Sequence, residues 1–228
     1  MAGNDKIITS FVVCSYRGVS IMVVDYIKYI CEKRMWMPMN ESLKKVYMKS
    51  AEQILLENDI SLEPPIDIDK LVKNMGIAVR EQEFESVEEA TGLPKDSILG
   101  ATLSLDNYLL LMYKKYENKR NDHGKRFTLA HELAHCALHA EELEINHLEL
   151  RSDVCNKDDP REVAANVFAG ELLIPENSLR KICNRFLIPS LSALTEIFDV
   201  SAGVMKKRLE ELGIQYFNDI KKDEIRVE

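Results

Sequence analysis

Three of the chain's five histidines lie in the segment FTLAHELAHCALH, which runs from Phe127 to His139. The first two, His131 and His135, flank a glutamate in the pattern His-Glu-x-x-His. Residues four apart on an α-helix lie one above the other on the same face, so the two imidazoles can share one ion. Zinc accepts imidazole nitrogen as a ligand. The spacing therefore predicts a zinc site on a helix.

Glu132 occupies the position that suits a general base in such a site. It lies about 100° around the helix from His131, beside the predicted metal but away from the row of ligands. This position suits a carboxylate that must touch a metal-bound water without binding the metal. The alternative is a structural helix in which hydrogen bonds, rather than a metal, satisfy two buried imidazoles.

A catalytic zinc usually has three protein ligands and one open position, so a third ligand must come from another segment. His139 continues the stripe, but it lies eight residues from His131, about 12 Å along a helix axis, which is too far for one ion. Glu162 opens a predicted helix and is a better candidate. It fits a capping box equally well, with Asp159 as the N-cap and Pro160 at the first helical position. The remaining candidates are His147, Asp153, Cys155 and Glu171.

Periodicity along the chain predicts an α+β fold with a small sheet of a few strands followed by helices. The elements expected before the histidine segment are a helix over 43–55, a short helix from Asp67 to Gly76, a strand over 77–84, an acidic loop over 85–96, and two strands within 97–113 with a turn near Asp106. Those expected from there on are a helix over 126–143, an irregular polar stretch over 144–158, a strong helix that ends at Pro175, and a helix, short turn and helix within 190–214.

Composition limits the class of protein. The chain has 228 residues, with 30 Lys and Arg against 38 Asp and Glu, for a net charge of −8. This balance argues against a nonspecific nucleic-acid or membrane-surface binder. The five cysteines form no Cys-x-x-Cys pair, which argues against a disulfide framework or a zinc finger. We therefore expect a protein of the reducing cytoplasm, with one sizeable domain and a smaller helical attachment.

Residues 1–42 are predicted to be an N-terminal extension of unknown role. Their longest clean apolar run, Ile21 to Val24, is shorter than the roughly 7–15 apolar residues of a signal peptide and the roughly 20 of a membrane span. A natural start at a later methionine, such as Met39, is an alternative reading of this segment. The other predicted domains are a metallopeptidase domain over 43–175 and a helical subdomain over 176–228.

Two separated motifs resemble the ImmA/IrrE family of zinc metallopeptidases. RFTLAHELAHCALH is followed by REVAANVFAGELLIP, which meets each named position of the family pattern Glu-x-x-Ala-Asn-x-Phe-Ala-x-x-Leu-Leu-x-Pro. The resemblance covers about residues 43 to 215, with Ala134 standing where glycine is common in the family. It implies a zincin-type helical core, one Zn²⁺ held by His131, His135 and Glu162, and Glu132 as the general base.

The resemblance also implies a function, which is that of an intracellular zinc endopeptidase. Family members include proteins that cleave or inactivate helix-turn-helix repressors of mobile elements and prophages, and others that act in stress responses. We therefore expect a protein substrate, most simply such a repressor. The donor that stabilises the oxyanion stays open among Tyr108, Tyr113, His123, His139 and His147.

The tail over 190–214 is similar to a helix-turn-helix, which raises the question of DNA binding. Its second helix begins with a basic run, Lys206 to Arg208, but acidic residues leave the pair without a net basic face. Because a DNA reader concentrates positive charge, we expect the pair to pack on the catalytic part and to make no direct contact with nucleic acid. The alternative function is a non-hydrolytic regulator that binds a repressor or DNA. Glu132 favours hydrolysis, because a purely structural zinc site has no need of a base.

Overall fold

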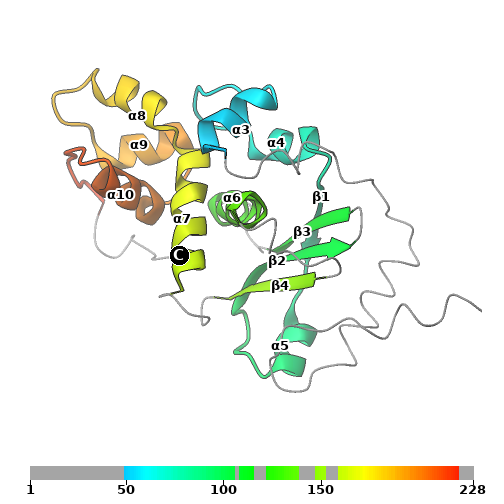
Figure 1. The fold of residues 1–228 in the computed structure, drawn as a ribbon. Coiled ribbons are helices and arrows are strands. Elements are labelled where there is room, and N and C mark those ends of the chain that lie inside the picture. The colour runs from blue at the N-terminus through cyan, green and yellow to red at the C-terminus, as the bar shows by residue number, and fades with distance from the viewer. Residues whose placement is uncertain (1–48, 106–107, 116–121, 139–146, 153–158, 221–228) are drawn as a thin grey trace, which may run out of the picture. The chain divides into compact units, whose positions relative to one another are not determined.

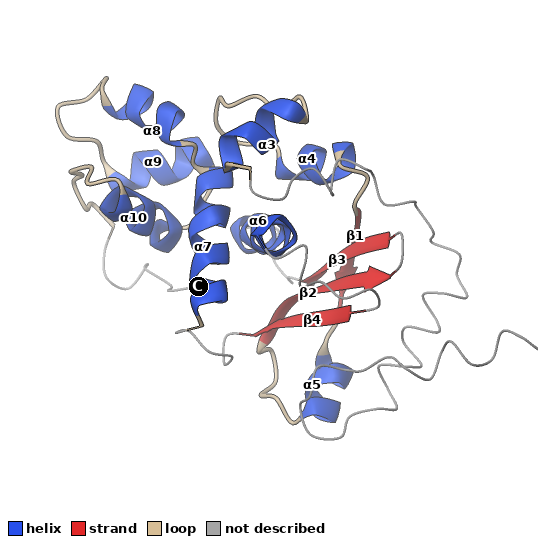
Figure 2. Ribbon diagram, viewed as in Figure 1, coloured by secondary structure: helices blue, strands red, loops and turns tan. Residues whose placement is uncertain are grey.

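The computed structural model has an α+β architecture, shown in Figures 1 and 2. It describes residues 49–105, 108–115, 122–138, 147–152 and 159–220. The predicted fold class is confirmed. The predicted extension over 1–42 lies outside the described residues, and the predicted domain boundary at residue 175 stays a prediction.

The described chain forms two compact units. The sheet unit draws on residues 76–115 and 141–155, and the helical unit on residues 40–75, 116–140 and 156–228. The predicted ligands His131, His135 and Glu162 all belong to the helical unit, and so does Glu132. The site can therefore be built from helices alone.

The sheet unit contains a four-stranded mixed sheet in the order β1-β3-β2-β4. Its strands are β1 (Ala78–Gln82), β2 (Ile98–Leu105), β3 (Tyr108–Lys114) and β4 (His147–Ser152). β1 runs parallel to β3, whereas β2 runs antiparallel to both β3 and β4. The three strands expected before the histidine segment are confirmed. β2 and β3 are inner strands, and their apolar side chains, such as Leu103 and Leu111, are buried.

Two segments of the sheet unit differ from the sequence predictions. The acidic stretch expected as a loop contains α5 (Glu85–Thr91), which ends at Gly92 in a left-handed conformation with φ of 72°. Glu88 is 4% exposed and accepts hydrogen bonds from the backbone N–H groups of Asp96 and Ile98, both at 2.8 Å. These long-range bonds give a buried role to a residue whose charge suggested an exposed loop.

The second difference is β4, which lies in the stretch expected to be irregular. Its residues His147 to Ser152 pair with β2, with Leu148 opposite Leu103 and Leu150 opposite Ala101. The two leucines alternate with polar residues, as they do in a strand. Six residues within a longer polar stretch gave too short a signal, and the strand is fixed by its pairing with β2.

The helical unit is arranged around α6 (Asp122–Leu138). Figure 1 shows α6 end-on, with α7, α3 and α4 around it, and α8, α9 and α10 gathered on the other side of α7. The other helices are α3 (Ala51–Glu57), α4 (Ile68–Asn74), α7 (Pro160–Leu173), α8 (Glu176–Cys183), α9 (Leu191–Phe198) and α10 (Ala202–Glu211). Residues 128–137 of α6 are all buried, including Cys136.

Capping residues account for where most of these helices begin. Asp67 and Ser190 cap α4 and α9 by accepting backbone N–H groups through their side chains. α3 begins only at Ala51, because Ser50 is its N-cap and forms a capping box with Gln53. The predicted helix over 43–55 is therefore wrong for residues 49 and 50, and its residues 43–48 lie outside the described residues.

The sequence analysis did not predict α8, which follows α7 directly after Pro175.

The turn between α9 and α10 is tied to the start of α6 by Asp199. The side chain of Asp199 lies 2.9 Å from His123 Nε2 and 3.2 Å from Arg126 Nε, and its carbonyl oxygen accepts a hydrogen bond from Arg126 Nε at 3.0 Å. Asp199 also has a left-handed conformation, with φ of 53°. Since α10 packs on both α7 and α9, the predicted helical pair lies against the helices that carry the site.

Among the described residues, no helix combines the length and the apolar composition that crossing a membrane would require.

Substitutions at Asp199 should separate its two roles. Asp199→Gly removes the carboxylate but tolerates the left-handed backbone, so we expect it to lower the free energy of unfolding by about 1–2 kcal/mol. Asp199→Ala should cost roughly 1 kcal/mol more, because alanine disfavours that conformation. Urea unfolding of both variants beside the unaltered chain measures this. Equal stability of all three proteins would show that the turn is not held by Asp199.

Candidate metal centre

α6 places His131 and His135 on one face with their rings in contact. The ring centroids lie 4.6 Å apart, and the two Nε2 atoms are 2.9 Å from each other. Both side chains are buried, with exposed fractions of 1% and 4%. Two nitrogens at this distance need a proton or a cation between them, because each would otherwise point a lone pair at the other.

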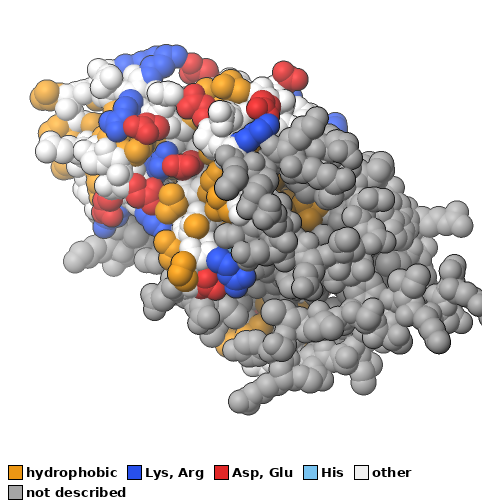
Figure 3. Space-filling view, viewed as in Figure 1, with side chains coloured by type: hydrophobic (Ala, Val, Ile, Leu, Met, Phe, Trp, Pro, Cys, Tyr) orange, Lys and Arg blue, Asp and Glu red, His pale blue; other side chains and the backbone are white. Residues whose placement is uncertain are grey.

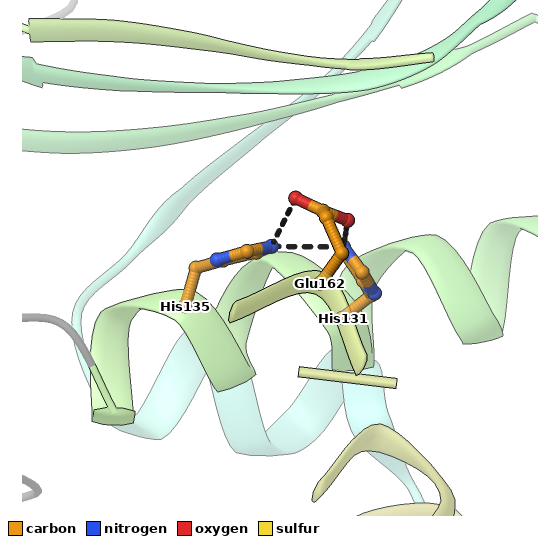
Figure 4. A group of neighbouring side chains, drawn as sticks. All are labelled: His131, His135 and Glu162. Carbon is orange, nitrogen blue, oxygen red and sulfur yellow. Dashed lines mark hydrogen bonds and ion pairs between the residues drawn. The ribbon is translucent and has the colours of Figure 1, made fainter. Parts of the chain in front are cut away.

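α7 brings the carboxylate of Glu162 to the same point (Figure 4). Its Oε2 lies 3.2 Å from His131 Nε2, and its Oε1 lies 3.3 Å from His135 Nε2. Glu162 is in the first turn of α7, and the Asp159 side chain caps that turn by accepting the N–H of Arg161 at 2.9 Å. The helix therefore starts with a cap that leaves the Glu162 side chain directed at the histidine pair.

Glu162 is prepared to carry a negative charge here. Burial opposes ionisation and by itself would raise the pKa of this carboxyl group. Hydrogen bonds from His131 and His135, together with their charge, outweigh burial and hold the pKa of Glu162 well below its usual range. An ionised carboxylate facing two imidazole nitrogens is a hard, anionic complement to a divalent cation.

The spacing of the donor atoms fits one metal ion. His131, His135 and Glu162 each offer one ligand atom, and these three atoms lie within 4.8 Å of one another. At zinc–ligand bonds of roughly 2.0–2.1 Å, two atoms at a tetrahedral angle lie about 3.4 Å apart. The two Nε2 atoms are 2.9 Å apart, and each has one oxygen of the Glu162 carboxylate at 3.2 or 3.3 Å, which is close to that edge length. Two imidazoles and one carboxylate also form a typical donor set for a catalytic zinc.

Asn166 orients the first histidine, a role that the sequence reading did not assign. Its Oδ1 lies 3.0 Å from His131 Nδ1. Because an amide oxygen can only accept, Nδ1 carries a proton, so the neutral ring of His131 keeps on Nε2 the lone pair that a metal requires. Asn166 lies four residues after Glu162 on α7, so i, i+4 spacing from the candidate ligand was the signal that could have revealed it.

Glu132 lies next to this group without being one of its three members. It is on the same buried stretch of α6 and is 1% exposed. Its role as the general base stays a prediction.

The other candidate metal ligands and the candidate oxyanion donors either have different partners, lie in other elements, or fall outside the described residues. Glu171 lies 3.4 Å from Arg208, and His123 pairs with Asp199. The backbone of His147 is in β4, in the sheet unit, and its side chain lies outside the described residues, as does that of Tyr108. Tyr113 is half-buried in β3. His139, Asp153 and Cys155 fall outside the described residues.

A His-Glu-x-x-His helix packed on a second helix that supplies a carboxylate is the arrangement of a zinc-metallopeptidase-like domain. Residues 116–210 match the family model of the IrrE N-terminal-like domain, Peptidase_M78. The resemblance to the ImmA/IrrE family is confirmed over these residues. The matched segment holds His131, Glu132, His135 and Glu162, and its family implies a protein substrate. The search of curated proteins found no match to the chain.

Removing the side chain of Asn166 should weaken metal binding. We expect Asn166→Ala to lower zinc affinity about 10–100-fold, because His131 loses the partner that fixes its protonated nitrogen. Asn166→Asp, which retains an oxygen acceptor, should stay close to the unaltered protein. Competition with a chromophoric chelator measures both, with Asn177→Ala on α8 as a control, since Asn177 bonds to Glu52. Unchanged affinity of Asn166→Ala would contradict this role.

Proposed function

We propose that the chain is a zinc-dependent endopeptidase. In this proposal His131, His135 and Glu162 hold one Zn²⁺, and Glu132 is the general base. The observation that carries it is the convergence of two buried imidazoles and an ionised carboxylate beside a second buried carboxylate. A structural site would need the three ligands but not Glu132.

Each residue has a defined part in the proposed reaction. A bound zinc ion supplies Lewis-acid activation of water and of a carbonyl oxygen. Glu132 accepts the proton of the water that attacks the scissile carbonyl, and its carboxyl group then delivers that proton to the leaving amine. Asn166 holds His131 in the tautomer that ligates. Burial of the histidine pair keeps water away from the ligand nitrogens and preserves their geometry.

We also propose that the substrate is a helix-turn-helix transcriptional repressor of a mobile element, prophage or stress response. The resemblance to the ImmA/IrrE family supports this substrate class. The net charge of −8 adds a physical reason, because DNA-binding proteins present basic surfaces that an acidic partner attracts. The reaction would take place in the cytoplasm, where such repressors act.

Regulation by direct DNA binding is the competing function, and the charges of α10 do not favour it. Lys206 lies 3.8 Å from Glu210, and Arg208 lies 3.4 Å from Glu171 and 3.5 Å from Glu211. The face in Figure 3 shows basic and acidic side chains interspersed over the helical unit. A surface that binds phosphates would instead concentrate positive charge.

Metal content tests the proposed ligands directly. We expect about one zinc per chain by elemental analysis, and loss of that zinc in His131→Ala and in Glu162→Ala. Matched controls come from the same helices: His123→Ala on α6 and Glu171→Ala on α7 should retain the metal. If zinc is absent from the unaltered protein even after it is added back, the histidine helix is structural and the regulator function takes precedence.

Cleavage of a candidate repressor tests the proposed base. Glu132→Gln preserves the size of the side chain but cannot accept a proton, so we expect the rate to fall about 10²–10⁴-fold. The variant should retain its zinc, which separates loss of the base from loss of the site. Products identified by mass spectrometry give the measurement. Equal cleavage by the variant would identify a contaminating protease or a different base.

A further inference from the structure

A cavity of about 190 Å³ lies beside the candidate metal centre, within the helical unit. α6 contributes Phe127 to its lining, and α7 contributes Asn166 and Gly170. The remaining lining comes from α10, including Val204 and Arg208. We refer to this space as the Gly170 cavity.

Two lining residues join the Gly170 cavity to His131. The ring of Phe127 lies 6.2 Å from the His131 ring, centroid to centroid, and Asn166 Oδ1 bonds to His131 Nδ1 at 3.0 Å. Phe127 is one turn before His131 on α6, and Asn166 is one turn after Glu162 on α7. A turn rises about 5.4 Å, which equals the span of one to two residues of an extended peptide. A peptide with its carbonyl at the metal centre would therefore place a nearby side chain at this cavity.

Gly170 keeps the cavity open. It lies inside α7 and is buried, although glycine is less favourable than alanine within a helix. A Cβ atom built at this position would meet no atom within 4 Å. Packing therefore does not require glycine at residue 170. The absence of a side chain at Gly170 leaves this part of the cavity empty.

The lining favours an apolar occupant. Phe127 and Val204 provide hydrocarbon surface. Glu211 also lines the cavity, and its carboxylate lies 3.5 Å from Arg208 Nη1. Arg208 is 5% exposed, and its Nε donates to the Ile174 carbonyl oxygen at 3.3 Å, while its Nη1 lies near Glu171 and Glu211. Its charge is already compensated, so it does not require an anion from a ligand.

The size of the cavity fits a large side chain. An apolar cavity of about 150 Å³ is enough to hold benzene. The Gly170 cavity, at about 190 Å³, can therefore accept the side chain of leucine, methionine or phenylalanine. Lys207 is an exposed lining residue, so its methylene stem can border the space while its ammonium group stays in water.

We propose that the Gly170 cavity is a substrate subsite that selects a bulky apolar side chain within two residues of the scissile bond, with Gly170 as the specificity-determining residue. The cavity's assignment as a subsite rests on the proposed endopeptidase function. Its capacity to bind an apolar group does not.

The first arm of the test compares cleavage of a peptide library by the full-length, zinc-loaded protein and its variants. The unaltered chain should prefer leucine, methionine or phenylalanine at one position near the cut. Gly170→Leu fills the cavity, and it should lower kcat/KM for those peptides at least 10-fold relative to peptides with alanine there. Gly170→Ala should have a smaller effect in the same direction. Val163→Leu adds bulk at an exposed position of the same helix and should change nothing.

The second arm measures binding without catalysis. Benzene and isobutanol, as mimics of phenylalanine and leucine side chains, should shift the methyl NMR signals of Val204 saturably in the unaltered protein and in Val163→Leu. The shift should be lost in Gly170→Leu. Thermal unfolding of each variant establishes that the fold is retained, and Gly170→Ala serves as the mild substitution if Gly170→Leu does not fold.

The outcomes separate the two proposals. An unchanged preference in Gly170→Leu or Gly170→Ala, or an equal loss for every peptide, would overturn Gly170 as the determinant of specificity. If neither probe shifts Val204, the cavity does not accept apolar groups and the subsite is rejected, whether or not peptides are cut. If the probes bind but the zinc-loaded protein cuts no peptide, the hydrolytic function fails and the subsite assignment fails with it, leaving an apolar ligand site.

Discussion

The close packing of α6 against α7 sets the distance between a buried histidine pair and a carboxylate, and the candidate centre depends on that distance. His131 and His135 point their Nε2 atoms at each other across 2.9 Å, and Glu162 approaches both from the second helix. Buried polar groups of this kind are costly unless each has a partner. The need to satisfy these groups and the geometry of a metal ion therefore favour the same arrangement.

Local sequence was enough to predict the half of the site that lies on one helix. Helical spacing alone places His131 and His135 on a common face and Glu132 beside it. Glu162 was different, because the first turn of a helix is both where a capping carboxylate belongs and where this candidate ligand lies. Only packing distinguishes the two roles, and in the structure Asp159 caps the turn while Glu162 faces the histidines. The role of Asn166 also depends on packing, because its i, i+4 spacing from Glu162 is visible in the sequence but its contact with His131 lies across the two helices.

The fold shows the same division between local and long-range information. Asp67 as a helix cap, Pro175 as a helix stop and the apolar runs of β2 and β3 carry their own signals, and the elements that they mark were predicted. α5 and β4 were missed because they depend on partners outside the element itself: Glu88 holds the backbone of Asp96 and Ile98, and β4 pairs with β2. A short acidic helix and a six-residue strand have only weak intrinsic preferences for helix and strand. Contacts with other segments therefore determine that α5 and β4 form.

The contacts of α10 indicate a packing role for the tail with the helix-turn-helix pattern. Met205, Arg208 and Leu209 of α10 are buried, so one face of this helix packs within the helical unit. Arg208 reaches the carbonyl oxygen at the end of α7, and Val204 lines the cavity beside Asn166. On the exposed face of α10, Lys206 pairs with Glu210, so positive charge there is partly compensated, which does not favour a phosphate backbone. Arg208 is buried against α7 and also lines the Gly170 cavity, so the tail contributes to the site that we propose.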